Sequence, residues 1–116
     1  LSLRRQLARD NPAAFLPNVA GTLNNLGLLY RDTQRMKEAE SAYREAATLL
    51  EPLWRNSPAS LGELYAKILW GRADVLSGFP DARGEACRLF EESLAAAVSF
   101  PLREAIRQAK GRYCSQ

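Results

Sequence analysis

One stretch of the chain, residues 23–46, constrains the fold more than any other. Large, small and aromatic residues recur there at intervals of three and four, which is the spacing of one face of an α-helix. A glycine in such a face lets a second helix come close, and a neighbouring aromatic ring fills the space beside it. The pattern predicts two antiparallel helices that share one tight face, built from Leu23, Leu26, Gly27, Tyr30, Ala39, Tyr43 and Ala46.

The two halves of this stretch, Leu26-Gly27-x-x-Tyr30 and Ala39-x-x-x-Tyr43-x-x-Ala46, resemble the tetratricopeptide repeat (TPR), a helix–turn–helix unit of about 34 residues. The resemblance is greatest to bacterial-type repeats. It implies an all-α, right-handed solenoid of helical hairpins, with about six antiparallel helices, that serves as a non-catalytic scaffold for binding other proteins.

A second, weaker copy of the pattern follows when Pro12 is placed on Pro58, with one extra residue in the second turn. Size and polarity classes then recur at packing positions, as expected where each hairpin buries its face on the next. The matched pairs are Ala20 with Ala66, Leu23 with Leu69, Gly27 with Ala73, Tyr30 with Leu76, Ala39 with Ala86, Tyr43 with Phe90, and Ala46 with Ser93.

Proline, glycine and polar residues divide the chain into one domain of four segments. These are the end of a preceding helix (1–10), hairpin one (12–55), hairpin two (58–98) and a capping helix (101–113). Within the hairpins we expect an initial turn near Pro12, then helices over about Pro17–Arg31, Met36–Trp54 and Ala59–Leu76, and a further helix capped by Asp81 that ends near Val98. Ser57 is the expected cap of the helix that starts near Pro58, and Trp54 and Tyr65 are expected in the core between the hairpins.

Composition favours a helical, non-membrane protein. Hydrophobic residues make up 47% of the 116-residue chain, and long runs of Val, Ile and Thr are absent. No apolar stretch is long enough to cross a bilayer, and the first residues lack the apolar block of a signal peptide. Because the chain begins at Leu1, we expect it to be a piece of a longer protein. The net charge of +3 comes from the tail, where Arg103, Arg107, Lys110 and Arg112 face only Glu104.

The two cysteines, Cys87 and Cys114, have no neighbouring Cys or His at the spacing of a metal site. We interpret Cys87 as a small core residue and Cys114 as an exposed, inert thiol. This interpretation predicts a reduced, cytoplasmic setting.

Nothing in the sequence favours catalysis. The chain has no histidine, and its clustered glutamates fit a solvated helix face, with Glu40 and Arg44 spaced for a surface ion pair. Gly78 and Gly84 do not form a phosphate-binding loop. We therefore predict no enzyme, no cofactor and no metal site.

The resemblance also implies a binding site, because the first helix of each hairpin in the family lines a concave groove. The residues opposite the packing face of those helices would contact a peptide or protein partner: an amide for a peptide backbone, an aromatic anchor, and cations for a carboxylate. The residues are Asn24, Leu28, Arg31, Lys67, Trp70 and Asp74, with Gly21, Asn25 and Gly71 beside them. Two alternatives stay open at this point: Trp70 packing between the hairpins, and Asn24-Asn25 as solvated surface.

Two other functions compete with peptide binding. One is self-association into a homo-oligomer through the terminal helices, which is favoured if the last helix is half of a third repeat instead of a cap. The other is nucleic-acid binding through the basic C-terminal helix. A simpler explanation of these cations is that positive charge near a helix C-terminus interacts favourably with the helix dipole.

Overall fold

The computed structural model describes residues 12–114, and all regular secondary structure in that range is helical. Its elements are α2 (Pro12–Asp32), α3 (Met36–Asn56), α4 (Pro58–Leu76), α5 (Arg83–Ala96) and α6 (Phe100–Cys114). The sequence-based prediction of about six helices included one over residues 1–10, which lie outside the described range. The described residues therefore give an all-α fold of five helices.

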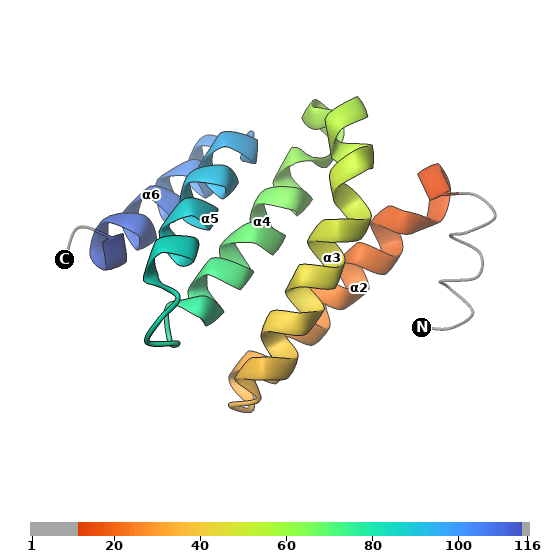
Figure 1. Ribbon diagram of the computed structural model, residues 1–116. Helices are drawn as coiled ribbons and strands as arrows, with labels where there is room; N and C mark the ends of the chain where they lie inside the picture. Colours follow the sequence, from red (N-terminus) through yellow and green to blue (C-terminus); the bar gives the residue numbers. More distant parts are fainter. Residues whose placement is uncertain (1–11, 115–116) are drawn as a thin grey trace.

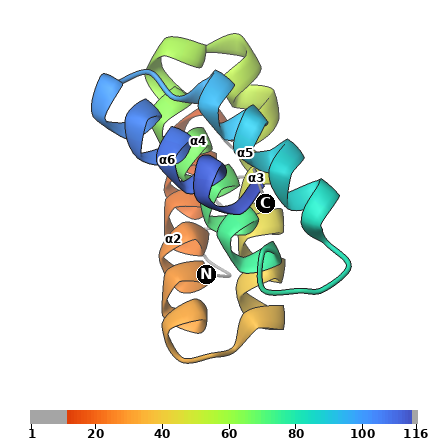
Figure 2. The same cartoon turned by 90° about the vertical axis from the view of Figure 1, so that its left-hand side faces the viewer.

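The helices form two layers (Figures 1 and 2). Successive helices pack against each other along the chain, and α2 also packs against α4. In the two views, α2, α4 and α6 make up one layer, and α3 and α5 lie over them as the other layer. Helix α6 thus follows α5 in the same way as α4 follows α3, because each returns the chain to the layer that contains α2.

The core follows the predicted spacing. Helix α3 buries a stripe at Ala39, Tyr43, Ala46 and Leu50, and the matching stripe of α5 contains Ala86, Phe90 and Ser93. Positions paired by the internal repeat are buried alike in all the named pairs except Tyr30 and Leu76; Leu23 and Leu69, for example, are each 3% exposed. Hydrophobic burial joins the two hairpins through a main cluster, which contains Ala46, Leu50, Ala86 and Phe90, and a smaller cluster of Ala39, Tyr43 and Val75.

Tight packing around Tyr43 confirms the central prediction of the sequence. The Tyr43 ring is fully buried, and Tyr30 packs against the same small cluster of Ala39, Tyr43 and Val75. A Cβ atom on Gly27 would lie 2.7 Å from the ring. Glycine is required there because any side chain would collide with the aromatic ring.

Trp54 and Tyr65 also lie where the sequence placed them, between the hairpins, with ring centroids 4.6 Å apart. Ser57 occupies the N-cap position of α4 and Pro58 its first turn, as predicted, but the Ser57 side chain makes no capping hydrogen bond. The turn before α3 contains Gln34, whose φ of 65° is left-handed.

Three predicted helix boundaries were wrong. Helix α2 begins at Pro12 and contains Pro17, instead of starting there. Because Pro17 lies in the second turn of α2, it removes only one of the earliest helical hydrogen bonds.

Helix α5 begins at Arg83 with Ala82, and not Asp81, at its N-cap. Turn hydrogen bonds, such as that from the Ala82 amide to the Phe79 carbonyl, hold the preceding residues outside the helix. At its other end α5 stops at Ala96, before Val98, because Glu63 of α4 accepts the Val98 and Ser99 amides.

The interpretation of the cysteines was also wrong. Cys87 and Cys114 form a disulfide, with their Cα atoms 5.8 Å apart. Packing of α6 on α5 brings together two residues that are 27 positions apart in the sequence. The bond fastens the last residue of α6 to the middle of α5.

Candidate functional site

A pocket of about 400 Å³ lies among α2, α4 and α6. Helix α2 contributes three lining residues, and α4 contributes four, of which Lys67, Gly71 and Asp74 have the same spacing as the three of α2. Helix α6 closes the pocket with Leu102, Ala109 and Arg112. Helix α3, which belongs to the other layer, contributes the ring of Tyr43. The lining residues are Asn24, Leu28, Arg31, Tyr43, Lys67, Trp70, Gly71, Asp74, Leu102, Ala109 and Arg112.

All six residues predicted to face the groove lie around this pocket. Asn24, Arg31 and Trp70 are half-buried, whereas Leu28, Lys67 and Asp74 are exposed. Trp70 meets both descriptions that the sequence left open, because it packs against the core and also lines the pocket. Whether these residues bind a partner stays a prediction.

An ion pair joins two of these residues across the pocket wall. The Arg31 guanidinium on α2 donates a hydrogen bond of 2.9 Å to the Asp74 carboxylate on α4. Partial burial opposes the charged form of Arg31, but the charge and hydrogen bond of Asp74 outweigh it and raise the pKa of the guanidinium. The pair is accessible, with 34% of the Arg31 side chain and 48% of the Asp74 side chain exposed.

The pocket combines apolar surface with an excess of positive charge. Leu28, Trp70, Leu102 and Ala109 provide the apolar wall. Among the lining residues, Arg31, Lys67 and Arg112 supply cations and Asp74 supplies one carboxylate, and Asp32, outside the lining, also pairs with Arg31 at 3.5 Å. Such a site suits an extended segment that carries apolar side chains and negative charge.

Tyr43 is the one lining residue that comes from α3. Its hydroxyl oxygen has less than 1 Å² exposed and no hydrogen-bond partner among the described residues. Burial raises the pKa of Tyr43 to about 12, so the hydroxyl stays protonated at neutral pH. The sequence presented Tyr43 only as a packing residue, and its spacing gave no sign that it reaches the pocket.

The sequence also missed the part played by α6, which was assigned to capping. The lining residues Leu102 and Ala109 are apolar, so packing of a capping helix was enough to explain them from the sequence. Arg112 was counted with the basic tail. The place of α6 beside α2 and α4 in one layer gives it a lining role instead.

Several contacts fix α6 where it closes the pocket. At its start, the Glu63 carboxylate accepts hydrogen bonds from the Val98 and Ser99 amides at 2.6 and 2.9 Å and from the Ser99 hydroxyl at 2.7 Å. Arg103 donates to the Leu94 and Ala97 carbonyls at the end of α5. Near its end, an ion pair from Lys110 to Glu91 and the disulfide hold α6 to α5.

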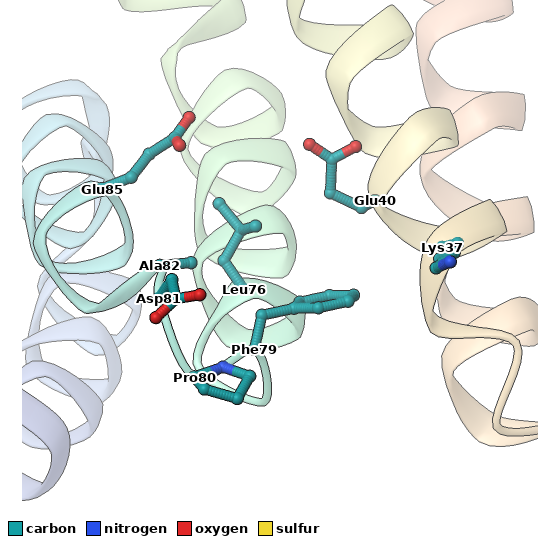
Figure 3. A pocket seen from close by; sticks show the side chains of 8 residues that line it. All are labelled: Lys37, Glu40, Leu76, Phe79, Pro80, Asp81, Ala82 and Glu85. Carbon is teal, nitrogen blue, oxygen red and sulfur yellow. The ribbon is translucent and has the colours of Figure 1, made fainter.

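A second hollow, of about 450 Å³, lies in the other layer, between α3, α5 and the loop at residues 79–82. Figure 3 shows Glu40 and Glu85 extending toward each other from α3 and α5, with Phe79 below them. Arg72 of α4 donates hydrogen bonds to both carboxylates, at 3.3 and 2.8 Å. Because these charges are satisfied within the protein, this hollow offers less to a charged ligand than the pocket does.

Comparison with family models, with curated proteins and with solved structures found no significant match to this chain. Within residues 12–114, no helix combines the length and hydropathy that spanning a bilayer requires. The same residues contain no group of three or more side chains suited to hold a metal ion.

Proposed function

We propose that this chain is a TPR-like protein-interaction module, a right-handed solenoid segment that binds a peptide segment of a partner protein in its concave pocket. The observation that carries the proposal is the convergence of Asn24, Leu28, Arg31, Lys67, Trp70 and Asp74 on one pocket. Helices α2 and α4, which the internal repeat pairs, supply three of these residues each.

The chemistry of the pocket supports a peptide over a small polar substrate. Trp70 and Leu28 offer apolar anchors, and the Asn24 amide offers both a donor and an acceptor to a peptide backbone. The pocket brings together no nucleophile and base of the kind that catalysis requires. We therefore place this chain among binding scaffolds instead of enzymes.

Structural contacts weaken the nucleic-acid alternative. In the basic tail, Arg103 is bound to carbonyl groups, Arg107 pairs with Glu104, and Lys110 pairs with Glu91. Arg107 and Lys110 are thus paired with carboxylates, and Arg103 is engaged by backbone carbonyls, which leaves less of the tail available to phosphate groups. For self-association we find no observation as specific as the pocket, and light scattering of the concentrated protein tests it: a monomer would remove that alternative.

A selection from a phage-displayed random peptide library tests the proposed function. We expect the wild-type protein to enrich peptides that a Lys67→Glu variant fails to retain. Lys67 is exposed, so the reversal of its charge alters the pocket without disturbing the core. Lys37→Glu is the matched control, because Lys37 is an exposed lysine of the second hollow.

The Trp70→Ala, Arg31→Ala double variant extends the test to the aromatic anchor and the ion pair, with circular dichroism to verify folding. Peptides retained equally by the wild type, Lys67→Glu and the folded double variant would contradict the proposed function. So would a selection that enriches no peptide at all.

A further inference from the structure

The Tyr43 hydroxyl is a buried polar group whose hydrogen-bonding capacity is not used in the free protein. Its oxygen has less than 1 Å² exposed and lacks a hydrogen-bond partner among the described residues. Buried hydroxyls in folded proteins are nearly always paired, because an unpaired one lowers stability. A phenylalanine would fill the same slot without this penalty, so packing alone does not account for a tyrosine.

The aromatic ring cannot turn away from this position. A Cβ atom on Gly27 of α2 or Gly71 of α4 would lie 2.7 or 2.4 Å from ring atoms of Tyr43, so both helices press directly on the ring. Tyr43 also lines the concave pocket. The hydroxyl is therefore held in one place beside the pocket.

Tyr43 lines the same pocket as the charged pair Arg31 and Asp74. Burial is the largest influence on the pKa of Tyr43, and the charges of Arg31, Asp74 and Asp32 also act on it. Unlike the Tyr43 ring, the side chains of Arg31 and Asp74 are partly exposed and joined by a bridge of the kind that contributes little to stability. A ligand can therefore displace Asp74 from Arg31 at low cost.

We propose that Tyr43 is a ligand-binding residue: a carboxylate side chain of an acidic partner segment replaces Asp74 on Arg31 and accepts a hydrogen bond from the Tyr43 hydroxyl. This inference rests on the proposed function and names the chemistry of its ligand. Charge complementarity selects an acidic segment, because the pocket cations Arg31, Lys67 and Arg112 outnumber Asp74 and Asp32, the two carboxylates that pair with Arg31.

Asp74 then acts as an internal stand-in for the ligand. In the free protein it occupies the guanidinium of Arg31, and in the complex the incoming carboxylate takes that place. The ligand gains a charge-assisted hydrogen bond from a hydroxyl that water does not reach, which makes the contact stronger than an exposed one. Lys67 adds a second positive charge at the mouth of the pocket.

The test compares the wild type with Tyr43→Phe, using synthetic peptides from the library selection and calorimetry to measure affinity. We expect Tyr43→Phe to resist urea as well as or better than the wild type, and to bind a selected acidic peptide about 10- to 100-fold more weakly. Tyr30→Phe is the matched control, because Tyr30 belongs to the same cluster but does not line the pocket.

A Glu→Gln or Asp→Asn change in the peptide completes a double-mutant cycle. We expect this change to weaken binding to the wild type and to have a much smaller effect on Tyr43→Phe. Equal affinity of both proteins for the acidic peptide, or equal effects of the amide substitution on both, would overturn the inference. A marked loss of stability in Tyr43→Phe would also overturn it, because the hydroxyl would then have a partner in the free protein.

These outcomes separate the inference from the proposed function. If the selection yields peptides that depend on Lys67 but are not acidic, or that bind Tyr43→Phe normally, the pocket is a binding site and only the role of Tyr43 is wrong. If no peptide depends on the pocket, the proposed function itself fails.

Discussion

The ring of Tyr43 lies so close to Gly71 that a Cβ atom on Gly71 would be 2.4 Å from ring carbon Cε1. Gly71 was expected beside the groove, and it does line the pocket, but it also lets α4 contact an aromatic side chain of α3. Together with Gly27, it allows the repeated helices to converge on one ring. Tyr43 and Gly71, which pack tightly on each other, thus also line the pocket.

Substitution of these glycines by alanine tests that arrangement. We expect Gly27→Ala and Gly71→Ala each to lower the free energy of unfolding by about 1–3 kcal/mol, because the added methyl group overlaps a ring that cannot move aside. Urea denaturation measures the change. Gly21→Ala is the control, since a Cβ atom there meets nothing within 4 Å, and it should stabilise α2 by about 0.5–1 kcal/mol. Similar effects at all three positions would contradict the proposed close contact.

Glu63 makes the docking of α6 dependent on pH. Hydrogen bonds from Ser99, through its hydroxyl and its amide, and from the Val98 amide lower the pKa of this carboxyl below its ordinary value of 4.5. Because the folded-state pKa is depressed, the stabilisation is fully present above pH 4.5 and is lost as pH falls through the lowered folded value. We expect Glu63→Gln to reduce stability at neutral pH by about 1–3 kcal/mol.

The measurement for Glu63 is urea denaturation at a series of pH values. The difference between the wild type and Glu63→Gln should be largest at neutral pH and should shrink at acidic pH. Glu104→Gln is the control, since Glu104 makes only an exposed i,i+3 pair with Arg107 in the described structure. A difference that does not change with pH would contradict the role assigned to the Glu63 charge.

Reduction of the disulfide should loosen α6 and leave the first hairpin intact. The bond closes a loop with a sequence separation of 27 residues, for which the chain-entropy relation gives about 3–4 kcal/mol of stabilisation. We expect a Cys87→Ser, Cys114→Ser variant to lose about that much stability. Amide exchange should show reduced protection in α6 and little change in α2 and α3. Equal stability of the variant and the oxidised protein would contradict a stabilising role of the disulfide.

The sequence was most informative where a local pattern determines a contact. Gly27, Tyr30 and Tyr43 identified the tight helix pair because spacing alone places them on facing surfaces. This prediction needed only helical periodicity and a hairpin. The six pocket residues were instead expected from the resemblance to a repeat whose first helices line a groove, and the structure brings all six to one pocket.

Asp81 has the chemistry of an N-cap, but local turn hydrogen bonds, such as that from the Ala82 amide to the Phe79 carbonyl, delay the helix. The other features that were missed depend on non-local packing. The end of α5 depends on Glu63, a residue 35 positions from Val98. The cysteine pair and the pocket-lining face of α6 likewise arise only once α6 packs beside α5.

The most direct test of the central claim is an NMR titration of the protein with a peptide from the library selection. We predict that chemical shifts change mainly at pocket residues of α2, α4 and α6, such as Asn24, Trp70 and Ala109, and at Tyr43. Shift changes centred on the second hollow around Phe79, or spread evenly over both layers, would contradict the claim that the concave pocket is the binding site.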